Sequence, residues 1–200
     1  MELGKVFFPA PWGRPSFGTV EGINAITLPE LKRHYETHFT PNGSILSAAG
    51  KIDWDLLLAR TEELFGDWTG AENELPVETD SGIMTKHIPF DSAQTHIGLA
   101  WPSVPVNDPD YLLLKSAVGV LSGGMSCRLF DEVREKRGLC YSVSASYYST
   151  KDHGAVFCYW GSSNETARQA LEVIVGELRK LTDYGITNDE LERLKIRSKS

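Results

Sequence analysis

The sequence has few cysteines, no long apolar run and no excess of basic residues. Its three cysteines, Cys127, Cys140 and Cys158, form no CxxC pair, so we expect buried free thiols and no disulfide framework. No window approaches the roughly 18 consecutive apolar residues that a membrane helix needs, so no membrane span is expected. The net charge of −7 also argues against a nucleic-acid partner, because phosphates bind to basic surfaces.

What is present is the composition of an ordinary globular chain. The 200 residues are 41% hydrophobic and 24% charged, and they suffice for one domain or two small ones. Met1-Glu-Leu-Gly4 shows no targeting signal. Both ends interrupt a pattern, so we expect a piece of a longer protein, and the sequence assigns no compartment.

The first part of the chain predicts two helices around one strand. Thr27 and Glu30 form a capping box that begins a helix, which ends at Pro41-Asn-Gly43. Residues 44–49 then suggest a short buried strand. Asp53 caps a second helix, which stops at Gly66. From Asp67 to Thr85 the apolar pattern dissolves, which predicts a linker.

The second part predicts an α+β fold, with antiparallel strands and helices packed on one face of the sheet. Asn164 is expected to cap the longest helix, which Gly185 ends, and Gly138 to end a shorter one in a left-handed turn. Thr187 and Glu190 form a second capping box. The expected strands cover 94–101, 140–149 and 154–161, and the expected helices cover 108–122, 126–136, 164–185 and the residues from 187 onward.

The histidines do not form a convincing metal site. His34 and His38 share a helix face, but Glu36 points about 200° away from His34, so an exposed helix surface is favoured over a zinc motif. We interpret the remaining three as isolated structural histidines: His87, His96 and His153.

Arg134 and Tyr141 are the candidate site residues. A helix carrying Arg134 passes through Gly138 into a strand that starts near Tyr141, so one turn can bring a guanidinium and a phenol together. Such a pair suits a peptide carbonyl or the oxyanion formed from it. The pattern alone favours a simpler interpretation, in which Arg134 pairs with Asp131, Glu132 or Glu135 and Tyr141 lies in the core.

Two runs of residues carry a family resemblance. Ser122-Gly-Gly-Met-Ser-Cys-Arg-Leu-Phe130 and Val133-Arg-Glu-Lys-Arg-Gly-Leu-Cys-Tyr-Ser-Val143 closely resemble the second domain of the M16 peptidases. These are zinc metallopeptidases of the pitrilysin and insulinase type, and they include the mitochondrial processing peptidase (MPP). Residues 12–19, 26–31 and 38–42 resemble the latter half of the family's first domain.

The resemblance implies a fold and a division of the chain. The fold is of the LuxS/MPP-like metalloenzyme type. Residues 1–70 would be the latter half of a first domain, 71–84 a linker, and 85–200 a truncated, inactive C-terminal domain. The R/Y pair of the family carries over to Arg134 and Tyr141, which would hold a peptide substrate at the zinc site.

The resemblance also implies where zinc would be. The family binds zinc through an H-x-x-E-H motif that this sequence lacks, so no metal ligand or cofactor is assigned here. We expect the fragment alone to be inactive, with zinc in the full-length parent or in a partner M16 subunit. A homodimer of the fragment is a further expected partner. The alternative is a non-catalytic structural paralogue, similar to the core proteins of respiratory complexes.

Overall fold

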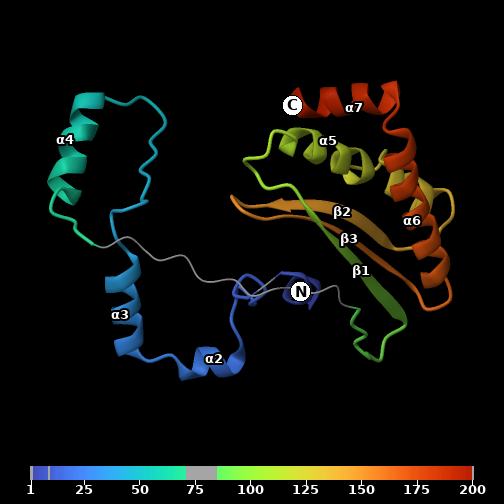
Figure 1. Ribbon diagram of the computed structural model, residues 1–200, viewed down its shortest axis with the longest axis horizontal. Helices are drawn as coiled ribbons and strands as arrows, with labels where there is room; N and C mark the ends of the chain where they lie inside the picture. The colour runs from blue at the N-terminus through green and yellow to red at the C-terminus, as the bar shows by residue number, and fades with distance from the viewer. Residues whose placement is uncertain (1, 9, 71–84, 200) are drawn as a thin grey trace. The chain divides into compact units, whose positions relative to one another are not determined.

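The computed structural model describes residues 2–8, 10–70 and 85–199 (Figure 1). These residues fall into two units, one formed by 8–70 and the other by 2–7 together with 85–199. The predicted linker, 71–84, lies outside the described residues, so the domain boundaries stay a prediction. No helix among the described residues is long and apolar enough to cross a membrane.

The unit of residues 8–70 contains three helices: α2 (Val20–Ala25), α3 (Leu28–His38) and α4 (Trp54–Phe65). The predicted caps are confirmed. The Glu30 carboxylate accepts hydrogen bonds from the backbone N–H and the hydroxyl of Thr27, at 2.9 and 2.7 Å. Asp53 accepts from the N–H of Leu56 at 3.1 Å, and Gly66 follows the last residue of α4.

The strand predicted over residues 44–49 is wrong. This segment belongs to no helix or strand, and Ile45 is 89% exposed. A strand exists only when a neighbouring strand accepts and donates its backbone hydrogen bonds. The described part of the 8–70 unit offers no such neighbour.

The other unit is built on a three-stranded antiparallel sheet in the order β1-β3-β2. The strands are β1 (Gln94–Ser103), β2 (Ser142–Ser149) and β3 (Gly154–Ser163). In the register, Trp160 lies between Ile97 and Val143, and Cys158 lies between Leu99 and Ala145. These rows form the face that carries the core.

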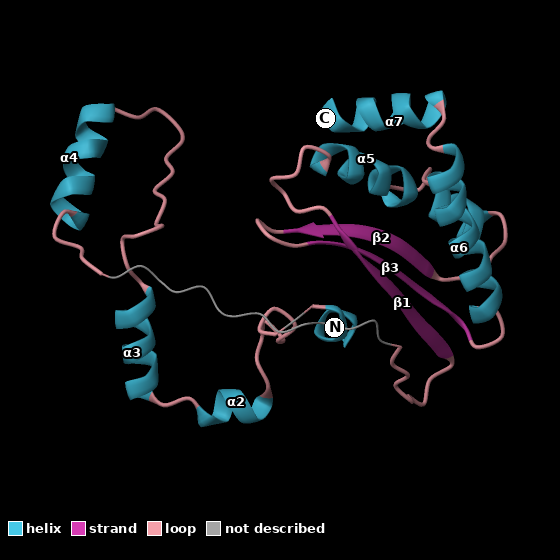
Figure 2. Cartoon of the chain, viewed as in Figure 1, coloured by secondary structure: helices cyan, strands magenta, loops and turns pink. Residues whose placement is uncertain are grey.

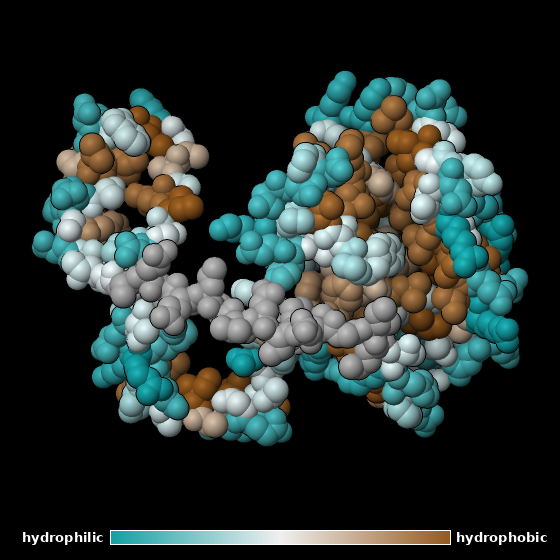
Figure 3. Space-filling model, viewed as in Figure 1, coloured by the Kyte–Doolittle hydropathy of each residue, from teal (hydrophilic) through white to brown (hydrophobic). Residues whose placement is uncertain are grey.

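Helices cover that face of the sheet (Figure 2). They are α5 (Tyr111–Ser122), η1 (Phe130–Glu135) and α6 (Ala167–Tyr184), and α7 (Asn188–Lys199) packs on α5. Hydrophobic side chains gather where α5, α6 and the sheet meet (Figure 3). Trp160, Leu129, Val133 and Ile174 are fully buried there. The predicted α+β architecture is confirmed.

The three cysteines are buried free thiols, as predicted. Burial raises the pKa of the Cys158 thiol to about 12. A thiol with such a pKa stays protonated at neutral pH, so Cys158 contributes packing rather than reactivity.

The start of α6 differs from the prediction. Asn164 does not cap the helix, which begins at Ala167 after Thr166. The Ser163 hydroxyl accepts the N–H of Thr166, and the Asn164 side chain instead accepts from the Thr95 hydroxyl of β1. Asparagine suits a helix start, but here its side chain is engaged by a tertiary contact.

The opposite face of the sheet carries an element that the sequence did not predict. Helix α1 (Glu2–Phe7) lies against this face near β1 and β3. The ring of Phe7 meets that of Phe157 edge to face, with centroids 5.6 Å apart. A Cβ at Gly98 would lie 2.8 Å from Leu3, so the glycine makes room for α1.

Candidate functional site

The candidate site is formed around the turn that joins η1 to β2. The last turn of η1 is wide, because the N–H of Lys136 bonds to the carbonyl of Asp131, five residues earlier. Gly138 then adopts φ +59°. The N–H of Gly138 donates to the Arg134 carbonyl at 2.9 Å. The N–H of Leu139 donates to the Val133 carbonyl, also at 2.9 Å. This is a Schellman motif, so the predicted role of Gly138 is confirmed.

The motif fixes the direction in which the chain leaves the helix. Leu139 and Val133 are both buried in the same core cluster. This apolar contact across the turn accompanies Schellman motifs and holds the turn against the body of the domain. Arg134 and Tyr141 therefore sit on either side of a rigid turn.

Both candidate residues lie at the surface. Tyr141 is 61% exposed, and its N–H donates to the Gly161 carbonyl of β3 at 2.8 Å. Arg134 is exposed, and its guanidinium lies 4.8 Å from the ring centre of Phe130, one turn earlier. A cation over an aromatic ring is held in place without losing its hydrogen-bond donors.

Two acidic residues of η1, Asp131 and Glu132, are paired with other cations. Lys136 contacts Asp131 at 2.8 Å and Glu132 at 2.6 Å, and Arg137 contacts Glu132. These cations lower the pKa of Glu132 to about 2. The simpler interpretation from the pattern, with Arg134 on one of these carboxylates and Tyr141 in the core, is therefore not what the structure shows.

The charge of Arg134 reaches the residue next to Tyr141. Burial raises the pKa of the Cys140 thiol, and the positive charge of Arg134 opposes that rise. What Arg134 and Tyr141 do together stays a prediction.

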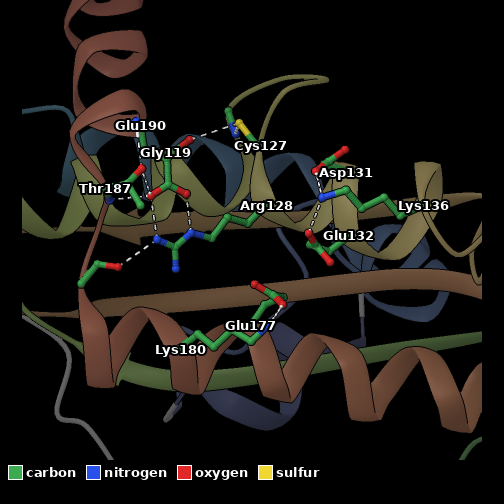
Figure 4. A network of polar contacts seen from close by, with 12 residues as sticks. Gly119, Cys127, Arg128, Asp131, Glu132, Lys136, Glu177, Lys180, Thr187 and Glu190 are labelled. Atoms are coloured by element: carbon green, nitrogen blue, oxygen red, sulfur yellow. Dashed lines mark hydrogen bonds and ion pairs between the residues drawn. The ribbon is translucent and has the colours of Figure 1, made fainter.

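A second polar network attaches this segment to the rest of the domain (Figure 4). Arg128 donates to both carboxylate oxygens of Glu190, at 2.5 and 2.7 Å, and to the Gly185 carbonyl at 2.8 Å. Glu190 also accepts from the backbone N–H of Thr187 at 2.7 Å, which confirms the second capping box. The sequence shows the box, but not the ion pair between residues 62 positions apart.

The sequence interpretation also missed a contact of His96. Its Nδ1 lies 2.7 Å from the hydroxyl of Tyr159, on the face of the sheet opposite the core. Strand alternation places both residues on that face, but only the pairing register places them side by side. His96 is therefore not isolated.

The described residues do not form a zinc site. No group of three or more histidine, cysteine, aspartate or glutamate side chains that could hold a metal ion occurs among them. The rings of His34 and His38 lie 4.4 Å apart on α3, without a third ligand in the described part of the chain. Zinc therefore does not fit these residues.

Comparison with known proteins identifies the family. The sequence profile of the peptidase M16 inactive domain matches residues 25–198. The chain belongs to the M16 peptidase family. A zinc protease of Streptomyces coelicolor is 31% identical to this inactive domain over 191 residues, and one of Bacillus subtilis is 31% identical over 193 residues. Both relatives are otherwise uncharacterized.

The matches cover most of this chain but less than half of these relatives. The match to the Streptomyces coelicolor protein covers 90% of this chain and 41% of that protein. The match to the Bacillus subtilis protein covers 94% of this chain and 46% of that protein.

Solved structures agree with the fold. The peptidase M16 inactive domain of Pseudomonas fluorescens aligns with 100% of this chain and 49% of its own, with a TM-score of 0.89 and 25% identity. A chain of Complex III2 from Candida albicans aligns with 99% of this chain and 50% of its own, with a TM-score of 0.81 and 20% identity. At that identity the likeness concerns the fold only.

Proposed function

We propose that this chain is the zinc-free, substrate-binding part of an M16 metallopeptidase. Arg134 and Tyr141 bind an unfolded peptide, and zinc is held elsewhere in the parent protein or by a partner M16 subunit. The observation that carries this proposal is the exposure of both side chains on either side of the rigid Gly138 turn.

The chemistry of the two side chains differs. The planar fork of Arg134 donates several hydrogen bonds and can hold a peptide carbonyl before and during the reaction. The hydroxyl of Tyr141 donates one hydrogen bond from a stiff ring. Such a donor has its largest effect on an oxyanion that develops in the transition state. Zinc supplies the activated water when it is bound at its own site.

The test is steady-state kinetics of peptide cleavage by the full-length protein together with its zinc-bearing half. We expect Tyr141→Phe to lower kcat more than it raises KM, at a cost of about 2.7–4 kcal/mol in transition-state stabilisation. We expect Arg134→Ala to raise KM and lower kcat.

Matched controls are available on the same elements. Tyr148→Phe changes an exposed tyrosine of β2, and Arg137→Ala changes an arginine whose guanidinium is engaged by Glu132. Neither should change turnover. If Tyr141→Phe leaves turnover intact and Arg134→Ala unfolds the domain, the pair is structural and the alternative of a non-catalytic paralogue is favoured.

A further inference from the structure

His96 and Tyr159 form an ordered pair on the face of the sheet opposite the core. Nδ1 of His96 lies 2.7 Å from Oη of Tyr159, and the two rings are within 10° of parallel, with centroids 6.0 Å apart. His96 is exposed, and Tyr159 is 41% exposed. A histidine needed only for core packing would be buried instead, so this arrangement holds a ring in place at the surface.

A glycine beneath the pair makes this arrangement possible. Gly161 pairs with His96 on one side and with Ser142 on the other. A Cβ at Gly161 would lie 3.3 Å from His96 Nδ1 and 3.3 Å from Tyr159 Oη, closer than ordinary contact. Any larger side chain at this position would therefore displace the hydrogen-bonded atoms.

On the side of β2, the surroundings of the pair leave room for a ligand. Tyr159 pairs with Gly98 in β1 and with Ser144 in β2. Leu3 of α1 lies over Gly98, whereas Ser142 and Ser144 are exposed and carry small side chains. The two aromatic rings therefore stand next to small residues of β2 on which an extended backbone can lie.

The pair lies within reach of the candidate site. The carbonyl of Gly161 accepts the N–H of Tyr141, so the backbone under His96 is bonded directly to that of Tyr141. His96 and Ser142 are separated by one strand, which places their backbones roughly 10 Å apart. An extended peptide covers about 3.3–3.6 Å per residue, so three or four residues suffice to span from His96 to Ser142, the residue after Tyr141.

The hydrogen bond to Tyr159 engages Nδ1 of His96 and leaves Nε2 for a ligand. In the tautomer whose Nδ1 accepts the proton of the Tyr159 hydroxyl, the neutral imidazole carries its own proton on Nε2. Nε2–H is then an available donor. Its natural partner is an oxygen acceptor, and an unfolded peptide offers one in every backbone carbonyl.

We propose that His96, oriented by Tyr159, is a further peptide-binding residue of this chain, and that its Nε2–H donates to a backbone carbonyl of the bound peptide. Tyr159 is a positioning residue, since it acts through the imidazole. This inference rests on the proposed function, because it extends the same peptide-binding surface from Tyr141 across β3 to β1.

The experiment measures binding of fluorescein-labelled casein, an unfolded protein, to this chain by fluorescence polarisation. His96→Ala should raise the Kd about threefold to tenfold, as expected for the loss of one hydrogen bond. His96→Gln, which keeps an N–H donor, should restore part of the affinity. Tyr159→Phe should raise the Kd by a smaller factor, because the ring remains and only its orienting hydroxyl is lost.

The control is His87→Ala, which removes an exposed histidine of the same unit that lies outside the strands. It should leave the Kd unchanged, and all variants should keep the thermal midpoint of the parent chain. If Arg134→Ala weakens binding and His96→Ala does not, the role of His96 is overturned and the proposed function stands. If the unmodified chain does not bind casein, or if neither Arg134→Ala nor His96→Ala weakens binding, both the role of His96 and the proposed function are overturned.

Discussion

At the scale of single residues, the carboxylate of Glu190 serves two partners at once. It binds the guanidinium of Arg128 and caps the start of α7 through Thr187. The side chains of Arg128 and Glu190 are only 14% and 12% exposed, so solvent screens the pair weakly. Arg128 and the hydrogen bonds of Thr187 lower the pKa of Glu190 from its ordinary 4.5 to about 2.

This depressed pKa predicts how stability depends on pH. The stabilisation by Glu190 is complete above pH 4.5, where the carboxylate is ionised in the folded and unfolded states, and it is lost as the pH falls toward 2. We expect Glu190→Gln to lower the free energy of unfolding by about 2–3 kcal/mol at pH 7. The difference from the parent chain should shrink steadily below pH 4.5.

Urea denaturation at a series of pH values measures both effects. The control is Glu192→Gln on the same helix, whose ion pair with Lys195 is exposed and therefore adds little. A Glu190→Gln difference that stayed constant down to pH 2 would contradict the assigned pKa.

At the scale of elements, the Schellman motif at Gly138 connects the helix of Arg134 to the strand that follows Tyr141. Gly138 has φ +59°, a left-handed conformation that other residues adopt at a cost. A Cβ there would meet no atom within 4 Å. Any penalty of substitution therefore comes from the backbone conformation and not from a collision.

We expect Gly138→Ala to lower the free energy of unfolding by about 1–2 kcal/mol. The control is Gly176→Ala in the middle of α6, where a Cβ also meets nothing within 4 Å. That substitution should stabilise the chain by about 0.5–1 kcal/mol, because alanine favours a helix interior. Urea unfolding of the two variants distinguishes them by sign, and equal effects would show that the left-handed turn is not required.

At the scale of the whole molecule, the unit of residues 8–70 buries little apolar surface. None of the residues of α2, α3 and α4 is buried, and Phe17, Ile45 and Trp54 are largely exposed. Apolar surface of this extent is unfavourable in water and favours association. The segment 44–49 adds backbone groups that pair with no strand in the part of the chain that the structure describes.

We therefore expect this chain, taken alone, to self-associate through residues 8–70. Sedimentation equilibrium should show a mass that rises with concentration, and Ile45→Asp should weaken the association. Ile196→Asp, at an exposed position of α7, is the control and should have no effect. A strictly monomeric chain whose residues 10–70 exchange their amide hydrogens freely would contradict this expectation.

A second prediction for the whole molecule concerns zinc. Because the described residues offer no group of three ligands, we expect less than stoichiometric zinc after dialysis and no cleavage of peptides by this chain alone. Elemental analysis and a peptidase assay check this. One tightly held zinc ion per chain would contradict it.

Features whose hydrogen-bond partners lie within a few residues of one another could be predicted from the sequence. The capping boxes at Thr27 and Thr187 and the turn at Gly138 were predicted correctly, because their hydrogen bonds join residues at most six positions apart. The three strands were also predicted within two residues of their observed bounds. Arg134 and Tyr141 could be proposed as site residues because one short segment contains both.

Features that depend on residues far apart in the chain could not be predicted from the sequence. The Arg128–Glu190 pair and the His96–Tyr159 pair join residues 62 and 63 positions apart, and no local pattern specifies such a contact. The segment 44–49 has a strand-like sequence but no neighbouring strand within the described residues, and Asn164 lost its capping role to a contact with Thr95. The physical reason is the same in each case: local propensity is worth a few tenths to one kcal/mol per residue, and burial and hydrogen bonding between distant segments outweigh it.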